Sequence, residues 1–121
     1  MPTSSSHFRA VIFDLFGTLI PPFPAERFER SLADMAAAVG VDAGAFTGMW
    51  IDETVGDRTT GAFDSIAANV QHICQALGVE PRHDAIGQAV AIRNDFTREV
   101  LQTSHDAVMT LQTIRDAGLC T

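Results

Sequence analysis

The sequence predicts an α/β chain that is mostly helical in its 121 residues, with a bundle of four helices inserted into an incomplete core. Three observations support this prediction. An apolar run at residues 8–13 is typical of a strand buried on both faces of a parallel sheet. Apolar residues then repeat at helical spacing through 22–102 without a second strand. One more helix and the opening of a second strand fill 104–121.

The first predicted strand ends in a carboxylate. Val11, Ile12 and Phe13 run directly into Asp14, and the turn residues Gly17 and Thr18 come next. Active sites of α/β proteins lie beyond the carboxyl ends of the strands. A charged Asp at the end of an apolar strand is costly to bury, so it either has a partner or serves a function. Asp14 is therefore the first candidate functional residue, the alternative being an Asp whose side chain caps the turn.

The middle of the sequence predicts four helices because apolar residues recur at spacings of three and four. These helices run from Ala25 to Val39, from an Asp42 cap through Trp50, from Phe63 to Leu77, and from Pro81 to Val100. Residues 56–61 are predicted to be a loop, and Gly40 and Gly78 to end helices. A fifth helix, capped by Ser104 and ended by Gly118, leads to a second strand that opens at 119–121.

Composition excludes several classes of protein. The net charge is −7, with 15 acidic and 8 basic residues, all of the basic ones Arg, so we expect no nucleic-acid partner. No apolar run approaches the roughly 20 residues of a membrane helix, and because residues 1–9 are Ser-rich without an apolar core, we expect no secretory signal there. We expect a cytoplasmic protein with reduced thiols, in which Cys74 is a small buried side chain.

The stretch Asp14-Leu15-Phe16-Gly17-Thr18-Leu19 resembles the first motif, Asp-x-Asp-x-Thr, of the haloacid dehalogenase-like (HAD) hydrolases. The resemblance implies that Asp14 is a nucleophile that forms a covalent ester, which water then hydrolyses. It also implies a Rossmann-like core from residues 1–21 and 103–121, with 22–102 as a helical cap. The stretch from Arg58 to Val79 is similar to the cap of that family, with a less specific match.

The sequence departs from this family after the first motif. The family carries a Ser or Thr at the end of its second strand, then a Lys or Arg, then an acidic motif, and these are absent from the 121 residues. We therefore expect the N-terminal portion of a larger enzyme, or a chain completed by a second copy or another polypeptide. By itself the 121-residue chain is expected to be inactive, because the donors that stabilise the transition state are missing.

Position 16 separates two chemistries within the family. Phe16 cannot supply the proton that a phosphatase needs for its leaving group, whereas halide leaves without one. This favours a dehalogenase without a cofactor. The alternative is a Mg²⁺-dependent phosphatase, with the metal held by the Asp14 carboxylate and the Phe16 backbone carbonyl. A third interpretation, from another class, is a non-catalytic helical module for binding or assembly.

The resemblance also implies contacts to a small anionic substrate. Phe16 and Thr18 would lie beside the nucleophile, and Arg58, in its predicted loop, would bind a substrate carboxylate or phosphate. Each has a plainer interpretation: Phe16 as a packed loop residue, Thr18 as a turn cap, and Arg58 as an exposed Arg. Two further side chains are interpreted structurally, Arg93 as an Arg that extends to solvent and Trp50 as core.

Overall fold

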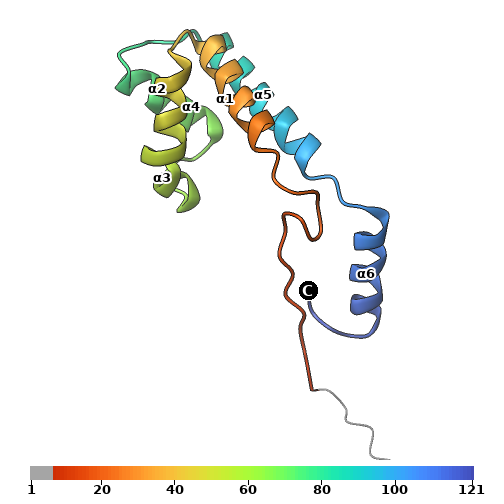
Figure 1. Cartoon of the computed structure of the whole chain (residues 1–121). Helices are drawn as coiled ribbons and strands as arrows, with labels where there is room; N and C mark the ends of the chain where they lie inside the picture. The colour runs from red at the N-terminus through yellow and green to blue at the C-terminus, as the bar shows by residue number, and fades with distance from the viewer. Residues whose placement is uncertain (1–6) are drawn as a thin grey trace, which may run out of the picture. The chain divides into compact units, whose positions relative to one another are not determined.

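The computed structural model describes residues 7–121, which are 63% helical, with six α-helices, one π-helical turn and no strand. The prediction of a mostly helical chain is therefore confirmed. Residues 7–23 and 100–121 form one compact unit, here called the terminal unit, and Pro24–Glu99 form a second, the helical unit. Figure 1 shows the helices of each unit along the colour gradient of the chain.

The helical unit contains five α-helices and the π-helical turn η1 (Figure 1). In chain order they are α1 (Ala25–Val39), α2 (Ala43–Gly48), η1 (Met49–Glu53), α3 (Val55–Thr59), α4 (Ile66–Ala76) and α5 (His83–Val100). The side chain of Asp42 accepts a hydrogen bond from the Ala45 N–H at 2.9 Å, which confirms the predicted cap of α2. Gly40 ends α1 with a φ of 76°, a backbone conformation that glycine adopts without steric cost.

The core of the helical unit is built from the apolar helix faces that the sequence predicts. Leu32, Met35 and Val39 of α1 are buried, as are Phe46 before the π turn and Trp50 within it. The buried side chains that α4 and α5 add are Val70, Ile73, Cys74 and Ala89. Cys74 is fully buried, as predicted, and burial raises the pKa of its thiol. One continuous apolar cluster therefore joins these helices.

Several segments of this unit differ from the prediction. The helix expected from Asp42 through Trp50 passes into η1, and residues 56–59 of the expected loop belong to α3 (Val55–Thr59). The helix expected from Pro81 begins at His83. The helix expected from Phe63 begins at Ile66, because the Ser65 side chain caps it by accepting from the Ala68 N–H at 3.1 Å. A π turn adds one residue to a single turn of the helix. The spacing of apolar residues does not indicate such an addition, so the sequence pattern does not predict η1.

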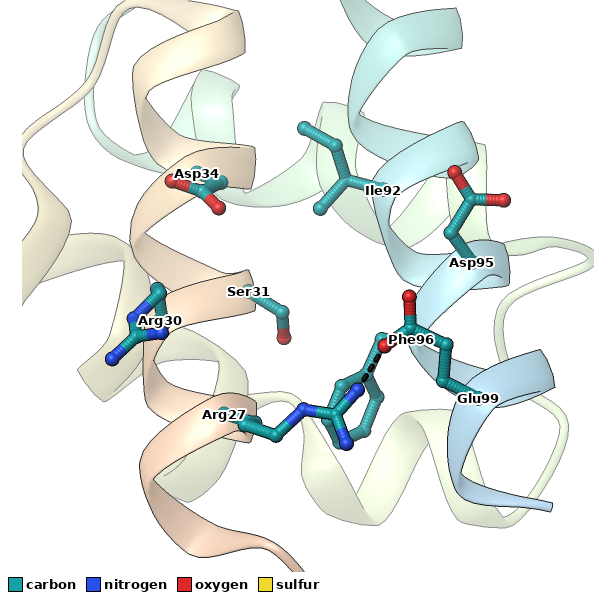
Figure 2. Close-up of a pocket in the computed structure, with 8 residues that line it drawn as sticks. All are labelled: Arg27, Arg30, Ser31, Asp34, Ile92, Asp95, Phe96 and Glu99. Carbon is teal, nitrogen blue, oxygen red and sulfur yellow. Dashed lines mark hydrogen bonds and ion pairs between the residues drawn. The ribbon is translucent and has the colours of Figure 1, made fainter. Parts of the chain in front are cut away.

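Helices α1 and α5 face each other across a shallow groove of about 250 Å³ (Figure 2). Arg27 of α1 and Glu99 of α5 form an ion pair across it, and the Phe28 and Phe96 rings lie 5.7 Å apart. Both members of the ion pair are exposed, so the apolar contact is the stronger of the two.

The terminal unit contains α6 (His105–Asp116) and two isolated parallel bridges, one between Ala10 and Cys120 and one within the turn between Phe16 and Ile20. Ser104 caps α6, as predicted, by accepting from the Ala107 N–H at 3.1 Å. Two backbone hydrogen bonds make the first bridge: Val11 N–H to the Cys120 carbonyl at 2.9 Å, and Cys120 N–H to the Arg9 carbonyl at 3.0 Å.

The strand predicted over residues 8–13 is wrong for the described structure, and so is its burial. Ile12 is 96% exposed and Phe8 75% exposed. A strand is stabilised by a ladder of hydrogen bonds to a neighbour and by cover on its faces. Among residues 7–121, Cys120 alone pairs with this segment, so a bridge forms and a strand does not. The Rossmann-like core accordingly remains an expectation.

The helices of the described residues lack the features of a membrane-spanning helix. The longest helix, α5, has 18 residues and carries charged side chains such as Arg93 and Glu99. Across residues 7–121, no helix combines the length and the apolar character needed to cross a bilayer.

The buried cluster predicts a large effect of truncating one of its members. We expect Ile73→Ala to lower the free energy of unfolding by about 2–5 kcal/mol, because it removes a fully enclosed side chain and leaves a cavity. Urea unfolding followed by the fluorescence of Trp50 measures this, and the exposed Gln75→Ala on the same helix is the control. Equal effects of the two substitutions would contradict the placement of the core.

Candidate functional site

Asp14 lies in the terminal unit, three residues beyond Val11, the last residue that pairs with Cys120. Its side chain is exposed. The backbone after it folds back tightly: the Leu15 carbonyl accepts from the N–H groups of Leu19 at 3.0 Å and Ile20 at 3.2 Å. The Gly17 N–H donates to the Ile20 carbonyl at 2.8 Å, and Gly17 has a φ of 76°, which a residue with a Cβ adopts only with strain.

Phe16 and Thr18 share this turn with Asp14. The Phe16 ring is 39% exposed and meets Phe23 edge to face at 5.2 Å. Thr18 is exposed and helps to line an open pocket of about 340 Å³ that also includes Pro22 and Ser104. In the part of the chain that the structure describes, no hydrogen bond joins Thr18 to Asp14. The turn therefore presents one carboxylate, one hydroxyl and one ring to solvent.

Arg58 lies in the helical unit, on α3 rather than in the predicted loop. Its side chain is half-buried and turns inward. Nη1 donates to the Trp50 carbonyl at 3.0 Å and to Asn69 Oδ1 at 3.1 Å, and it lies 3.3 Å from Thr54 Oγ1. The guanidinium carbon stands 4.3 Å from the centre of the Trp50 ring. Arg58 thus connects α3 to η1 and to α4. The interpretation of Arg58 as an exposed side chain does not predict this structural role.

Because of the π turn η1, the Trp50 carbonyl is available to accept a hydrogen bond from Arg58. In an α-helix the Thr54 N–H would bond the carbonyl four residues back, at Trp50. Here it bonds the Met49 carbonyl at 2.8 Å instead, and the Trp50 carbonyl accepts from Arg58. Single π turns inside helices are frequent at functional sites. The wider turn also carries Trp50 and Thr54 into the core, where both are enclosed.

Arg93, on α5, also turns inward, in contrast to the prediction that it extends to solvent. Its guanidinium carbon lies 5.7 Å from the Phe28 ring centre, 5.7 Å from that of Trp50 and 5.5 Å from that of Phe96. Burial lowers the pKa of Arg93. Burial also lowers the pKa of Arg58, and the nearby charge of Arg93 lowers it further. Two cations therefore share one aromatic neighbour, Trp50.

Three buried nitrogen atoms around this pair have no hydrogen-bond acceptor among residues 7–121. They are Trp50 Nε1, Asn69 Nδ2 and Arg93 Nη1. Trp50 and Asn69 are fully enclosed. The sequence analysis assigns no role to Asn69. The one feature of the sequence that could have indicated a role is that Asn69 is polar and lies on the apolar face of α4, next to Val70. We call Trp50, Arg58, Asn69 and Arg93 the arginine cluster.

The predicted site residues thus fall into two groups. Asp14, Phe16 and Thr18 share one turn of the terminal unit, and Arg58 belongs to the arginine cluster of the helical unit. Among residues 7–121, no three His, Cys, Asp or Glu side chains are grouped to hold a metal ion. No protein-family model, no curated protein and no solved structure matches the chain.

The contacts of Arg58 predict that it stabilises the fold. We expect Arg58→Ala to lower the free energy of unfolding by about 2 kcal/mol or more, because it leaves the buried Asn69 Oδ1 and the Trp50 carbonyl without their donor. Urea unfolding measures the change. Arg30→Ala, at an exposed Arg of the same unit, is the matched control and should shift the value by less than about 0.5 kcal/mol. An Arg58 variant as stable as the control would show that the side chain is free in solution.

Proposed function

We propose that the chain is the N-terminal portion of a haloacid dehalogenase-like hydrolase in which Asp14 is the nucleophile. The observation that carries the proposal is the parallel pairing of Ala10 with Cys120, with α6 directly before Cys120 in the chain. Parallel segments need a crossover connection, and a helix is the usual one. In the proposed enzyme this paired segment is the first strand of the sheet, and Asp14 follows it at the end where α/β enzymes carry out their chemistry.

The turn after Asp14 supports this role. The chain folds back on itself through the Leu15 carbonyl and Gly17, which fixes the backbone immediately after the carboxylate. The exposed Asp14 side chain is accessible to a substrate from solvent. Thr18 and Phe16 lie on the same turn and are proposed to contact that substrate, a small anion.

The reaction that fits Phe16 is a displacement that needs no acid. An Asp14 carboxylate oxygen bonds to the carbon that carries the halogen, and the carbon–halogen bond breaks with its electron pair leaving on halide. Water then adds to the carbonyl carbon of the Asp14 ester, and the acyl–oxygen bond breaks. The product is a hydroxy acid whose new hydroxyl oxygen came from Asp14, and Asp14 keeps one oxygen of water.

The alternative within the family is a Mg²⁺-dependent phosphatase. Asp14 and the Phe16 carbonyl would contribute two oxygen ligands, and further acidic ligands are not grouped with them among the described residues. The alcohol leaving group would also need a proton that Phe16 cannot supply. Phe16 at this position therefore favours the displacement of halide over the phosphatase reaction.

We further propose a cytoplasmic location. Cys74 and Cys120 are both free thiols. Cys74 is buried and Cys120 is exposed, so the exposed thiol is open to oxidants. A reducing compartment keeps such a thiol unmodified.

The proposed activity is tested on two proteins in parallel, the 121-residue chain and the product of the full reading frame that contains it. Each is assayed for halide release from 2-chloropropanoate and for phosphate release from p-nitrophenyl phosphate, with and without Mg²⁺. We expect metal-independent halide release from the longer protein, and none from the 121-residue chain above its Asp14→Asn variant, because the later donors are missing.

The matched control is Asp116→Asn, at an exposed acid of the same unit, which should leave the longer protein as active as the wild type. Mg²⁺-dependent phosphate release would replace the dehalogenase with the phosphatase. A reading frame that stops at residue 121, together with no activity, would leave the helical binding module as the function.

The fate of the oxygen atoms tests the covalent step. After a single turnover in H₂¹⁸O, we expect one ¹⁸O atom in the peptide that contains Asp14 and none in the hydroxy acid. Mass spectrometry of the digested protein and of the product measures both. Label in the product alone would mean that water attacks the substrate directly and that Asp14 is not the nucleophile.

A further inference from the structure

Arg58 and Arg93 are both half-buried, and neither has a carboxylate partner within residues 7–121. The ion pairs described for that range use other arginines at the surface: Arg27 with Glu99, Arg82 with Asp84, and Arg98 with Asp95. The chain has 15 acidic residues against 8 basic ones, so carboxylates are plentiful. A cation removed from water normally requires a counter-charge, and these two lack one from the described chain.

Aromatic rings replace that counter-charge only in part. The faces of Trp50, Phe28 and Phe96 attract the two guanidinium groups. A ring offers no hydrogen-bond acceptor in the plane of the guanidinium, however, and Trp50 serves both cations at once. The lowered pKa of each Arg has burial as its first cause, and repulsion by Arg93 adds to it at Arg58. Positive charge in the cluster is thus incompletely balanced.

The unpaired atoms of the cluster are all donors. Trp50 Nε1 and Asn69 Nδ2 belong to fully enclosed side chains, and Arg93 Nη1 is buried as well. Buried polar groups in proteins almost always have partners, so three donors without acceptors in one cluster require a reason. A water molecule would accept from one or two of them but would leave the charge unbalanced. A negatively charged group that only accepts hydrogen bonds would satisfy both needs.

We propose that the arginine cluster binds a small oxyanion, a carboxylate or a phosphate. Planar guanidinium groups match the oxygen spacing of both anions. Arg58 and Arg93 are half-buried, so solvent reaches part of each side chain, and the enclosed Trp50 and Asn69 each hold an unpaired donor. All four residues belong to the helical unit, so the site does not depend on Asp14 or on the reaction proposed for it.

Trp50 is the single tryptophan of the chain, so its fluorescence reports on this cluster. The 121-residue protein is titrated with sodium acetate and, separately, with sodium phosphate, with ionic strength held constant by sodium chloride. We expect a saturable change in Trp50 emission with at least one of the two anions, and a rise in melting temperature that saturates over the same concentrations. The anion that saturates identifies the class of ligand.

Three variants locate the response. Arg93→Gln should weaken binding at least tenfold, whereas Arg30→Gln, at an exposed Arg of α1, should bind as the wild type does. Asn69→Asp places a carboxylate beside Arg58 and keeps the acceptor that Arg58 already uses. We expect this variant to melt at a higher temperature than the wild type and to lose the response to added anions.

Circular dichroism shows whether each variant is folded. If Arg93→Gln does not fold, the wild type and Asn69→Asp decide the question by themselves. The proposal is wrong if neither anion gives a saturable signal in the wild type, or if the signal follows ionic strength alone. It is also wrong if Asn69→Asp responds to anions as the wild type does.

Discussion

The hydrogen bond from Arg58 to the carbonyl of Trp50 joins α3 to the π turn η1, and the other contacts around Arg58 depend on it. The bond exists because the π turn η1 redirects the Thr54 N–H to Met49 and leaves that carbonyl available. Through the same nitrogen Arg58 also reaches Asn69 on α4, so one side chain connects η1, α3 and α4. Trp50 in turn packs against Phe46, with ring centres 5.9 Å apart, which extends the connection to α2.

In this arrangement, hydrogen bonds between polar groups fix the relative orientation of short helices, which apolar packing alone does not determine. Apolar side chains attract one another without direction, and many relative rotations of short helices bury similar areas. Helix α3 contributes no buried side chain of its own, so packing alone holds it weakly. The hydrogen bonds of Arg58 select one orientation for it. The enclosed Thr54 adds a bond from Oγ1 to the Met49 carbonyl at 2.9 Å, which closes the turn.

The sequence was sufficient for those features that depend on neighbours in the chain. The apolar spacing of Leu32, Met35 and Val39 predicts α1, and Asp42 and Ser104 predict where α2 and α6 begin, because a cap acts within three residues. Arg58 and Asn69 were beyond such reasoning. Their contact spans α3 and α4, and it depends on a π turn that no spacing rule detects. The helical spacing predicts Trp50 to be core, but it does not predict that two cations contact its ring.

The terminal unit shows the same limit for the candidate catalytic residue. The motif around Asp14 predicts a turn after an apolar segment, and Gly17 makes that turn. Whether Val11, Ile12 and Phe13 form a strand depends on partners far away in the chain, and local pattern cannot supply them. One pair of residues, Ala10 and Cys120, meets in the described structure, which leaves Ile12 facing solvent.

The placement of the two thiols also has a use as a spectroscopic handle. Cys74 is enclosed in the apolar cluster, whereas Cys120 is exposed and sits at the bridge to Ala10. A spin label or fluorophore attached through a thiol would therefore go to Cys120, close to the segment that carries Asp14. With Trp50 as a second reporter in the other unit, each of the two units has a spectroscopic signal of its own. Motion at the bridge and events in the arginine cluster can then be followed separately in one sample.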